Sequence, residues 1–337
     1  MALTDFPLVS WTDQQFADYG TKPQACSHRL NELDMFSKAT LIKLLDSFPR
    51  DELQAFTMGT DPCDPGDWSS VDTGNASGEE LWQAVEKGAL WLNLLWIDVH
   101  RAEYGELLQQ LYGELSARVP RLQGFERAHL TLLISSPRAQ VYYHFDAEDN
   151  MLWHLQGEKT IYVYPVSHRD LAPPNVVEDI FARTASEELP FKHEYDPQAE
   201  AYDLQPGQVV SWPHSSPHRV QNGNSVNVSI STSVETHLSE RMRLTHCANR
   251  MLRQQFGFRN LATSELGLTA ASKRFAYKLV RKLGMLPRDV MPEYITPWRI
   301  DPAAEKGMRR LEQKVHTPFC STAKEKPELA SQPARAA

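Results

Sequence analysis

The middle of the chain consists of short apolar runs separated by turn-forming residues, and this pattern constrains the fold most strongly. Between residues 130 and 233 six runs are rich in β-branched and aromatic residues, with Gly, Pro or Asn between them: LTLLIS, QVYYHFD, MLWHLQ, KTIYVYP, QVVSWP and SVNVSISTSV. Such spacing predicts a β-sandwich or barrel rather than a parallel α/β sheet. A polar, proline-containing insertion at 165–204 is expected to lie outside the sheets.

Helical patterns flank this β-rich part on both sides. ATLIKLLDSF has apolar residues at helical spacing before Pro49, and a second helical face runs from Tyr104 to Leu115. Between them lie a long loop at 57–80, which we expect to border an active site, and the apolar run ALWLNLLWIDV, which predicts a buried strand. The sequence therefore predicts a mainly β protein with helical flanks. Its four parts are an N-terminal mixed helical segment packing on the core (1–95), a β-domain (96–235), a C-terminal helical region (236–318) and a disordered tail (319–337).

The composition excludes several classes of protein. Of the 337 residues, 41% are hydrophobic and 23% charged, and no apolar run reaches the roughly 20 residues that span a bilayer. The N-terminus lacks the basic and apolar regions of an export signal. The cysteines are far apart and form no C-x-x-C pair, which argues against a disulfide framework or a zinc site made of cysteines. We therefore expect a cytoplasmic protein.

Charge is distributed unevenly along the chain. The net charge of −8 argues against nucleic-acid binding, but between Glu240 and Arg310 the sequence has 15 Lys and Arg against 6 Asp and Glu. This basic stretch is either a solvated helical face that packs on an acidic body or a surface for an acidic partner or substrate.

Two H-x-D pairs occur in the chain, and a metal site needs both side chains on one face. His144 and Asp146 lie in a predicted strand, where residues two apart project from the same side and can reach one ion. His168 and Asp170 lie in VSHRDLAPPN, which has no strand pattern, so no shared face is implied. His144 and Asp146 are therefore the candidate metal ligands, and His154 is expected to line the pocket or to be structural.

A divalent iron site needs a third ligand, usually from a distant strand. In LQPGQVVSWPHSSPHRVQN, Gly207 opens a strand, Pro213 ends it and His218 begins the next one. His214 lies within the turn, whereas the His218 ring can point back into a barrel. His218 is the candidate third ligand.

These stretches resemble the two motifs of the cupin superfamily. The second cupin motif has glycine, proline, histidine and asparagine at the spacing of Gly207, Pro213, His218 and Asn222, and Ser215 here replaces its middle glycine.

The first cupin motif is H-x-H followed by glutamate and glycine. At the same spacing this chain has His144-Phe-Asp146, then Asn150 and Gly157, and Arg138 replaces the leading glycine. The replacements leave two histidines and one carboxylate. Such a facial triad keeps three positions open, enough for a bidentate co-substrate and dioxygen.

With these replacements the chain is similar to the JmjC branch of the Fe(II)/2-oxoglutarate-dependent oxygenases, the branch of the asparaginyl hydroxylase that inhibits the hypoxia-inducible factor. In that branch a lysine in a G-x-K context follows the first histidine by 15 residues, and Gly157-Glu-Lys159 has this spacing. The resemblance implies that Lys159 pairs with the distal carboxylate of 2-oxoglutarate. It also implies that Asn150 lies near the 1-carboxylate and that Ser231 is a further polar contact.

One family position differs. A threonine three residues before the first histidine often helps to bind 2-oxoglutarate, and Val141 stands there. Tyr142, which has the strand parity of His144, is expected to replace that hydroxyl, unless a hydroxyl from an earlier strand does so.

The resemblance implies a double-stranded β-helix (jelly-roll, cupin/JmjC type) that uses Fe(II), 2-oxoglutarate and dioxygen, with hydroxylation as the default outcome. A non-oxygenase metal-binding cupin, either an isomerase or a binding module, is the alternative, and a scaffold without chemistry is the third. The expected substrate is a small molecule or a protein, and neither nucleic acid nor a membrane is expected as a partner. The C-terminal helices either form a homodimer or simply cover the barrel, through apolar residues that include Met242, Met251, Leu252 and Phe256.

Overall fold

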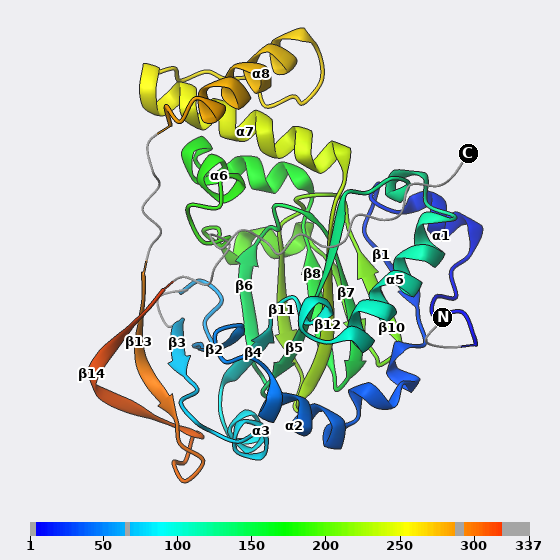
Figure 1. The fold of residues 1–337 in the computed structure, drawn as a ribbon, viewed down its shortest axis with the longest axis vertical. Coiled ribbons are helices and arrows are strands. Elements are labelled where there is room, and N and C mark those ends of the chain that lie inside the picture. Colours follow the sequence, from blue (N-terminus) through cyan, green and yellow to red (C-terminus); the bar gives the residue numbers. More distant parts are fainter. Residues whose placement is uncertain (1–4, 65–67, 287–292, 319–337) are drawn as a thin grey trace.

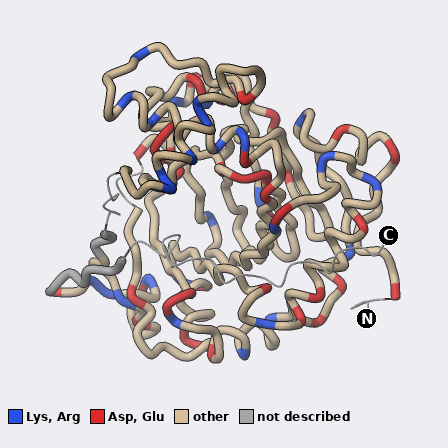
Figure 2. The backbone as a smooth tube through the Cα atoms, turned by 45° about the horizontal axis from the view of Figure 1, so that its top comes forward, with Lys and Arg blue, Asp and Glu red and all other residues tan. Residues whose placement is uncertain are grey.

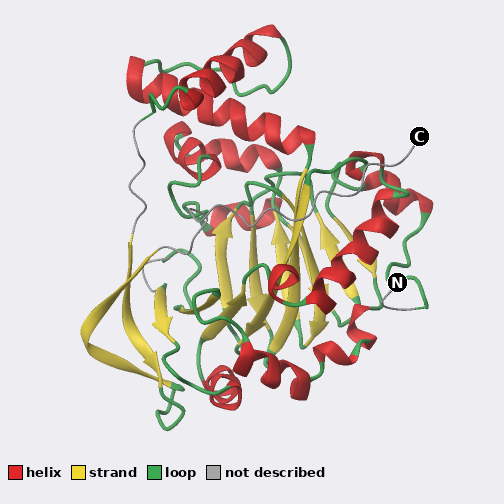
Figure 3. Ribbon diagram, in the orientation of Figure 1, coloured by secondary structure: helices red, strands yellow, loops and turns green. Residues whose placement is uncertain are grey.

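A computed structural model describes residues 5–64, 68–286 and 293–318. Its strands form two sheets that pack on each other, and helices cover the outside (Figure 1, Figure 3). The strands are β1 (Gln24–Ser27), β2 (Leu53–Thr57), β3 (Ser69–Asp72), β4 (Leu90–Leu94), β5 (Arg127–Ser135), β6 (Gln140–His144), β7 (Asp149–Gln156), β8 (Lys159–Val163), β9 (Glu200–Leu204), β10 (Gln208–Ser211), β11 (His218–Asn222), β12 (Asn227–Glu235), β13 (Glu293–Ile300) and β14 (Met308–Pro318).

The helices come mainly before and after the jelly-roll strands in the sequence. The α-helices are α1 (Asp13–Asp18), α2 (Lys38–Ser47), α3 (Gly78–Lys87), α4 (Ile97–His100), α5 (Ala102–Ser116), α6 (Pro174–Phe181), α7 (His237–Phe256) and α8 (Leu268–Lys282). Short 3-10 helices are η1 (Leu30–Glu32), η2 (Asp34–Phe36), η4 (Pro120–Leu122), η5 (Val166–Leu171) and η6 (His193–Gln198). Among the described residues, no helix has the length and apolar character that crossing a membrane requires.

Strands β5 to β12 are divided between the two sheets in the order of a jelly-roll. The larger sheet has the central order β10-β7-β12-β5, and the smaller sheet has the order β6-β11-β8-β9. All these neighbours are antiparallel. This is the strand order of a double-stranded β-helix, in which strand pairs wind around a shared interior. The fold class predicted from the sequence is confirmed.

The middle strands of the larger sheet are buried on both faces. Leu152 of β7 points into the barrel, where it packs with Val220 of the smaller sheet. Its neighbour Trp153 points outward and is fully buried, and its ring stacks on Trp11 with 6.5 Å between the ring centroids. The Trp153 indole Nε1 also donates a hydrogen bond to Thr232 Oγ1 at 2.9 Å. Burial on both faces explains why MLWHLQ is almost continuously apolar.

The N-terminal part extends the larger sheet at both edges. β1 pairs with β10, β4 pairs with β5, and β2 and β3 continue the sheet beyond β4. The helices predicted around ATLIKLLDSF and between Tyr104 and Leu115 are confirmed as α2 and α5, and ALWLNLLWIDV begins with β4. The prediction of one continuous loop at 57–80 is wrong in extent, because β3 lies within that range and pairs with β2.

The prediction of a C-terminal helical region at 236–318 is correct for α7 and α8 and wrong for its end. Residues 293–318 form the hairpin of β13 and β14, and β13 pairs in parallel with β3. Pro297 lies at a shift of register in β13, and β14 is rich in charged residues, so neither strand shows an alternating pattern. The tail 319–337 lies outside the described residues, and the domain boundaries at 95/96 and 235/236 stay predictions.

The insertion at 165–204 was predicted to lie outside the sheets, which is wrong for its last five residues. They form β9, the edge strand that pairs with β8. Only Leu204 of β9 is buried, so the apolar pattern that identifies a strand is missing.

The turn between β7 and β8 depends on Gly157. Its φ is +89°, and a Cβ at this position would lie 2.4 Å from the Val226 carbonyl oxygen. Gly157→Ala is therefore expected to lower the free energy of unfolding by about 1–3 kcal/mol from backbone strain alone, with a further loss from the clash. Urea denaturation measures this. Gly124→Ala is the control, because Gly124 has φ +67° and open space around its Cβ position. Equal losses in the two variants would contradict the clash.

Candidate metal centre and co-substrate cavity

His144, Asp146 and His218 meet because β6 pairs with β11. His144 is the last residue of β6, His218 is the first of β11, and the two are direct partners in the antiparallel register. Their ring centroids lie 4.2 Å apart, and His218 Nε2 lies 3.5 Å from Asp146 Oδ2. One ligand atom from each of the three residues lies within 4.8 Å of the other two. The structure thus brings together the three residues predicted as a metal triad.

Both imidazole rings present Nε2 to this cluster. His144 Nδ1 lies 2.7 Å from the Tyr142 carbonyl oxygen, and His218 Nδ1 lies 3.1 Å from the Ser216 carbonyl oxygen. A carbonyl only accepts, so each Nδ1 carries the proton and each Nε2 of the neutral ring keeps a lone pair. Backbone carbonyls hold metal-binding histidines in this way. Burial and the neighbouring His144 lower the pKa of His218 well below its usual range, which keeps this ring neutral.

The Asp146 carboxylate lacks one partner. Its Oδ2 atom is buried and has no hydrogen-bond partner within the described ranges. Burial raises the pKa of Asp146, and the neighbouring His144 lowers it. A bare carboxylate oxygen beside two imidazole lone pairs is a donor set that fits a divalent transition metal.

The triad opens onto a cavity of about 370 Å³ inside the barrel. Asn150 and Ser231 line this cavity, and Ser231 Oγ donates a hydrogen bond to Asn150 Oδ1 at 2.9 Å. Both predicted co-substrate residues therefore face the same space as the triad. Their role toward 2-oxoglutarate stays a prediction.

The prediction that Tyr142 shares the face of His144 is wrong. Between the pairs His218↔His144 and Val220↔Val141 the β6 strand has one residue more than β11, which is a β-bulge. The bulge turns Val141 toward the cavity, whereas the Tyr142 hydroxyl accepts a hydrogen bond from the Gly59 N–H at 3.2 Å.

The alternative of a hydroxyl from an earlier strand agrees better with the structure. Thr131 of β5 is the direct partner of Ser231 of β12, and both line the cavity together with Ser233. Thr131 and Ser233 are absent from the predicted site. Hydroxyls at alternating positions in LTLLIS and SISTSV were the signal that could have identified them.

Lys159 lines a smaller cavity of about 30 Å³. The two cavities share an apolar collar that includes Val141, Leu152 and Val220. Lys159 is only 6% exposed, and burial lowers the pKa of its ammonium group to about 7. Within the described part of the chain, no carboxylate forms an ion pair with it. A buried ammonium group suits an anionic ligand, and the pairing of Lys159 with the distal carboxylate of 2-oxoglutarate stays a prediction.

Carboxylates form one wall of the larger cavity. The segment from Ala185 to Glu188 lies against the triad, and Glu188 forms a backbone bridge with His144. Glu148 and Glu187 also line the cavity, and Glu148 pairs with Arg183. The insertion between β8 and β9 thus closes the cavity beside the candidate metal centre.

The other histidines of the β-rich part have structural partners. His154 is fully buried and lies 2.9 Å from the Gly157 carbonyl oxygen through Nε2. His214 Nε2 lies 3.1 Å from the Ala147 carbonyl oxygen. His168 Nε2 lies 2.8 Å from Gln198 Oε1, whereas Asp170 pairs with Arg169, so the second H-x-D pair is not a metal site.

Comparisons with known proteins find similar structures only at low similarity. No family model and no curated protein matches the chain. E. coli ycfD has 15% sequence identity and a TM-score of 0.47, over 83% of this chain and 70% of that chain. YcfD, a ribosomal oxygenase from Escherichia coli in complex with cobalt and 2-oxoglutarate, has 13% identity and a TM-score of 0.46, over 85% and 74%. A cupin superfamily protein from Desulfitobacterium hafniense has 14% identity and a TM-score of 0.20, over 33% and 69%. At these levels the neighbours do not assign a function to this chain.

The buried ammonium of Lys159 is expected to cost stability at low pH. Its folded pKa of about 7 lies below the usual 10.5, so the unfolded chain binds more protons between these values and the free energy of unfolding rises with pH across this window. Lys159→Met removes this rise. Below pH 7 the variant is expected to be more stable than the wild type by on the order of 4 kcal/mol, and the difference shrinks toward pH 10.5.

Urea denaturation at several pH values tests this expectation. Lys43→Met is the control, because it makes the same replacement at a lysine that lies exposed on α2. A difference between Lys159→Met and the wild type that stays constant from pH 7 to 10.5 would mean that the ammonium is not buried.

Proposed function

We propose that the chain is an Fe(II)- and 2-oxoglutarate-dependent oxygenase that hydroxylates its substrate. One observation carries the proposal: two imidazole Nε2 atoms and one carboxylate converge on the wall of one cavity, and a buried lysine lines a second, smaller cavity that shares apolar lining residues with the first. A site for the metal alone has no use for a buried ammonium group beside it.

His144, Asp146 and His218 would hold Fe(II) from one side. Two neutral imidazoles and one carboxylate leave the positions toward the cavity open, which suits non-haem Fe(II) better than a closed structural site. When bound, Fe(II) and 2-oxoglutarate supply the reaction with dioxygen that yields succinate, CO2 and one oxygen atom inserted into a substrate C–H bond. The task of the protein is to position this C–H bond and to exclude water.

The remaining cavity residues would orient 2-oxoglutarate. The Lys159 ammonium would pair with the distal carboxylate, and the collar of Val141, Leu152 and Val220 is apolar, which suits the methylene groups of 2-oxoglutarate. Asn150 and Ser231 offer an amide and a hydroxyl near the triad. A carboxylate bound to Lys159 would also raise the pKa of the ammonium and so keep it charged.

We expect a small molecule or a protein side chain as the substrate. The carboxylates of Glu148 and Glu188 line the larger cavity and would repel the phosphates of a nucleic acid. Burial and the neighbouring carboxylates raise the pKa of Glu187 to about 8, so this third side chain is mostly protonated at neutral pH. The chain has free thiols at Cys26, Cys63 and Cys247, which is consistent with a reducing compartment such as the cytoplasm.

Anaerobic titration of the apo-protein with Fe(II) and then 2-oxoglutarate tests this function. The wild type is expected to develop the weak visible charge-transfer band of the bidentate chelate. His144→Ala is expected to lose the band, because one iron ligand is gone. Lys159→Ala is expected to need roughly ten- to hundredfold more 2-oxoglutarate, the loss of one hydrogen bond to a charged group.

Asp170→Ala is the matched control, since Asp170 belongs to the H-x-D pair outside the site and is exposed. It is expected to behave as the wild type. Iron binding without a band at any 2-oxoglutarate concentration would reject the oxygenase and favour a non-oxygenase metal-binding cupin.

We also propose that the C-terminal helices form a homodimer. Met251 is buried and Met242 packs against the barrel side, but Phe256 is 65% exposed. On α8 and its C-cap Leu283, four further apolar side chains follow the seven- and four-residue spacing of a helix–helix seam. They are Leu268, Phe275, Leu279 and Leu283, with exposures of 90%, 71%, 46% and 62%. Lys and Arg also lie on these helices (Figure 2). A second copy of α8 would cover the exposed apolar side chains and leave the Lys and Arg side chains at the edge of the contact.

Light scattering on a sizing column tests the dimer. The wild type is expected to have twice the mass of one chain, and Phe275→Glu is expected to run as a monomer because it places a charge in the seam. Leu171→Glu is the control, since Leu171 is 62% exposed and belongs to η5 and not to α8. A monomeric wild type or a dimeric Phe275→Glu would contradict the proposal.

A further inference from the structure

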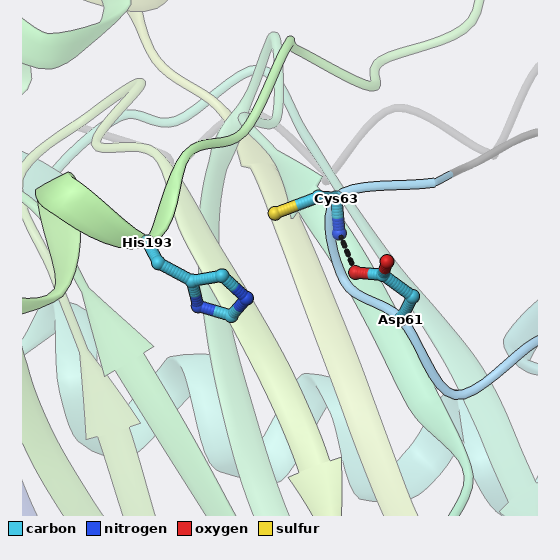
Figure 4. Close-up of side chains that lie close together, drawn as sticks. All are labelled: Asp61, Cys63 and His193. Carbon is cyan, nitrogen blue, oxygen red and sulfur yellow. Dashed lines mark hydrogen bonds between the residues drawn. The ribbon is translucent and has the colours of Figure 1, made fainter.

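A second group of metal-ligating side chains lies on the surface. Asp61 and Cys63 lie in the loop after β2, and His193 begins η6, about 130 residues later in the chain. A carboxylate oxygen, the thiol sulfur and a ring nitrogen of these residues all lie within 4.8 Å of one another. Figure 4 shows the Cys63 sulfur and the His193 ring turned toward each other, with the Asp61 carboxylate beside them. None of the three belongs to the triad inside the barrel.

The loop holds two of the three groups together. Asp61 Oδ1 accepts a hydrogen bond from the Cys63 N–H at 2.8 Å, which brings the carboxylate and the thiol close together. All three side chains are exposed, so an ion can reach them from solvent.

The His193 ring is oriented by a carboxylate. Its Nδ1 lies 3.3 Å from Asp196 Oδ2, and an ionised carboxylate only accepts, so the proton lies on Nδ1 and Nε2 keeps its lone pair. Asp196 Oδ1 in turn accepts hydrogen bonds from Tyr164 Oη and Arg219 Nη2, both at 2.7 Å. A carboxylate behind a histidine is the usual support of a zinc ligand, and here the support is fixed to the barrel through β11.

We infer that Asp61, Cys63 and His193 bind a divalent transition-metal ion, with Zn²⁺ as the ion that fits best. A thiolate, an imidazole and a carboxylate are the three ligand types of zinc sites, and a fourth position remains for water. The thiolate disfavours Mg²⁺ and Ca²⁺, which take oxygen ligands. Binding deprotonates the Cys63 thiol, and the proton is released to solvent.

Both segments that carry the ligands also reach the larger cavity. Phe56 and Trp68, which line the larger cavity, lie before and after Asp61 and Cys63. Ala185 to Glu188 line it too, and His193 follows five residues later. An ion at the surface site would therefore connect two parts of the cavity wall and restrict their motion.

Titration of the full chain with Co²⁺ under a reducing agent tests this site. Thiolate-to-cobalt charge transfer absorbs in the near ultraviolet, and the His144, Asp146 and His218 triad has no thiolate that produces this band. The wild type is expected to bind two Co²⁺ ions and to show the band. His144→Ala is expected to keep the band and lose one ion, whereas Cys63→Ser loses the band and one ion.

Further variants distinguish a built site from stray binding. His193→Ala is expected to lose the band, and Asp196→Asn is expected to keep it with about 10- to 100-fold weaker affinity. Cys320→Ser is the control for the remaining cysteine outside the described residues, and it is expected to leave the band unchanged. The inference is wrong if the wild type shows no band, if the band persists in Cys63→Ser, if His193→Ala binds as tightly as the wild type, or if Cys320→Ser abolishes the band.

Discussion

The pairing of β6 with β11 is the interaction on which the candidate centre depends. Because His144 and His218 are direct partners across this ladder, their rings meet at one end of the smaller sheet, and Asp146 follows just beyond the strand. A slip of one residue would turn every side chain of β6 to the opposite face. The bulge that turns Val141 into the cavity lies in the same ladder, so one register sets both the metal ligands and the apolar collar.

Lys159 stands in contrast to the rest of the barrel interior. Its neighbours Leu152, Ile161 and Val220 bury apolar surface, whereas its ammonium group loses hydration and gains no carboxylate among the described residues. A buried ionisable side chain that lowers the stability of the ligand-free protein is typical of a binding site, because the ligand supplies the missing partner. β12 pairs along most of its length with both β5 and β7. This pairing stabilises the barrel and offsets the cost of burying the Lys159 ammonium group.

Much of the fold could be predicted because strand texture and helical spacing are local properties. The jelly-roll strands other than β9, and helices α2, α5 and α7, follow from apolar patterns of a few residues. β9 could not be predicted, because four of its five side chains are not buried and its strand exists only through pairing with β8. The prediction for Tyr142 was wrong for a related reason, because the bulge in β6 depends on its pairing with β11, about 74 residues later in the chain. The triad was found because the pair His144 and Asp146 and the lone His218 carry motif spacing, whereas Asp61, Cys63 and His193 have none, and only the folded chain brings them together.

The parallel pairing of β13 with β3 has a consequence for the newly made chain. β3 has β2 on one side and receives β13 on the other, but β13 begins about 220 residues after β3 ends. At translation rates of roughly 5–20 residues per second, this edge of β3 stays unpaired for roughly 10–45 s after it leaves the ribosome. An open strand edge can pair with other chains. The last strands of the described chain thus determine how long a nascent molecule remains exposed to aggregation.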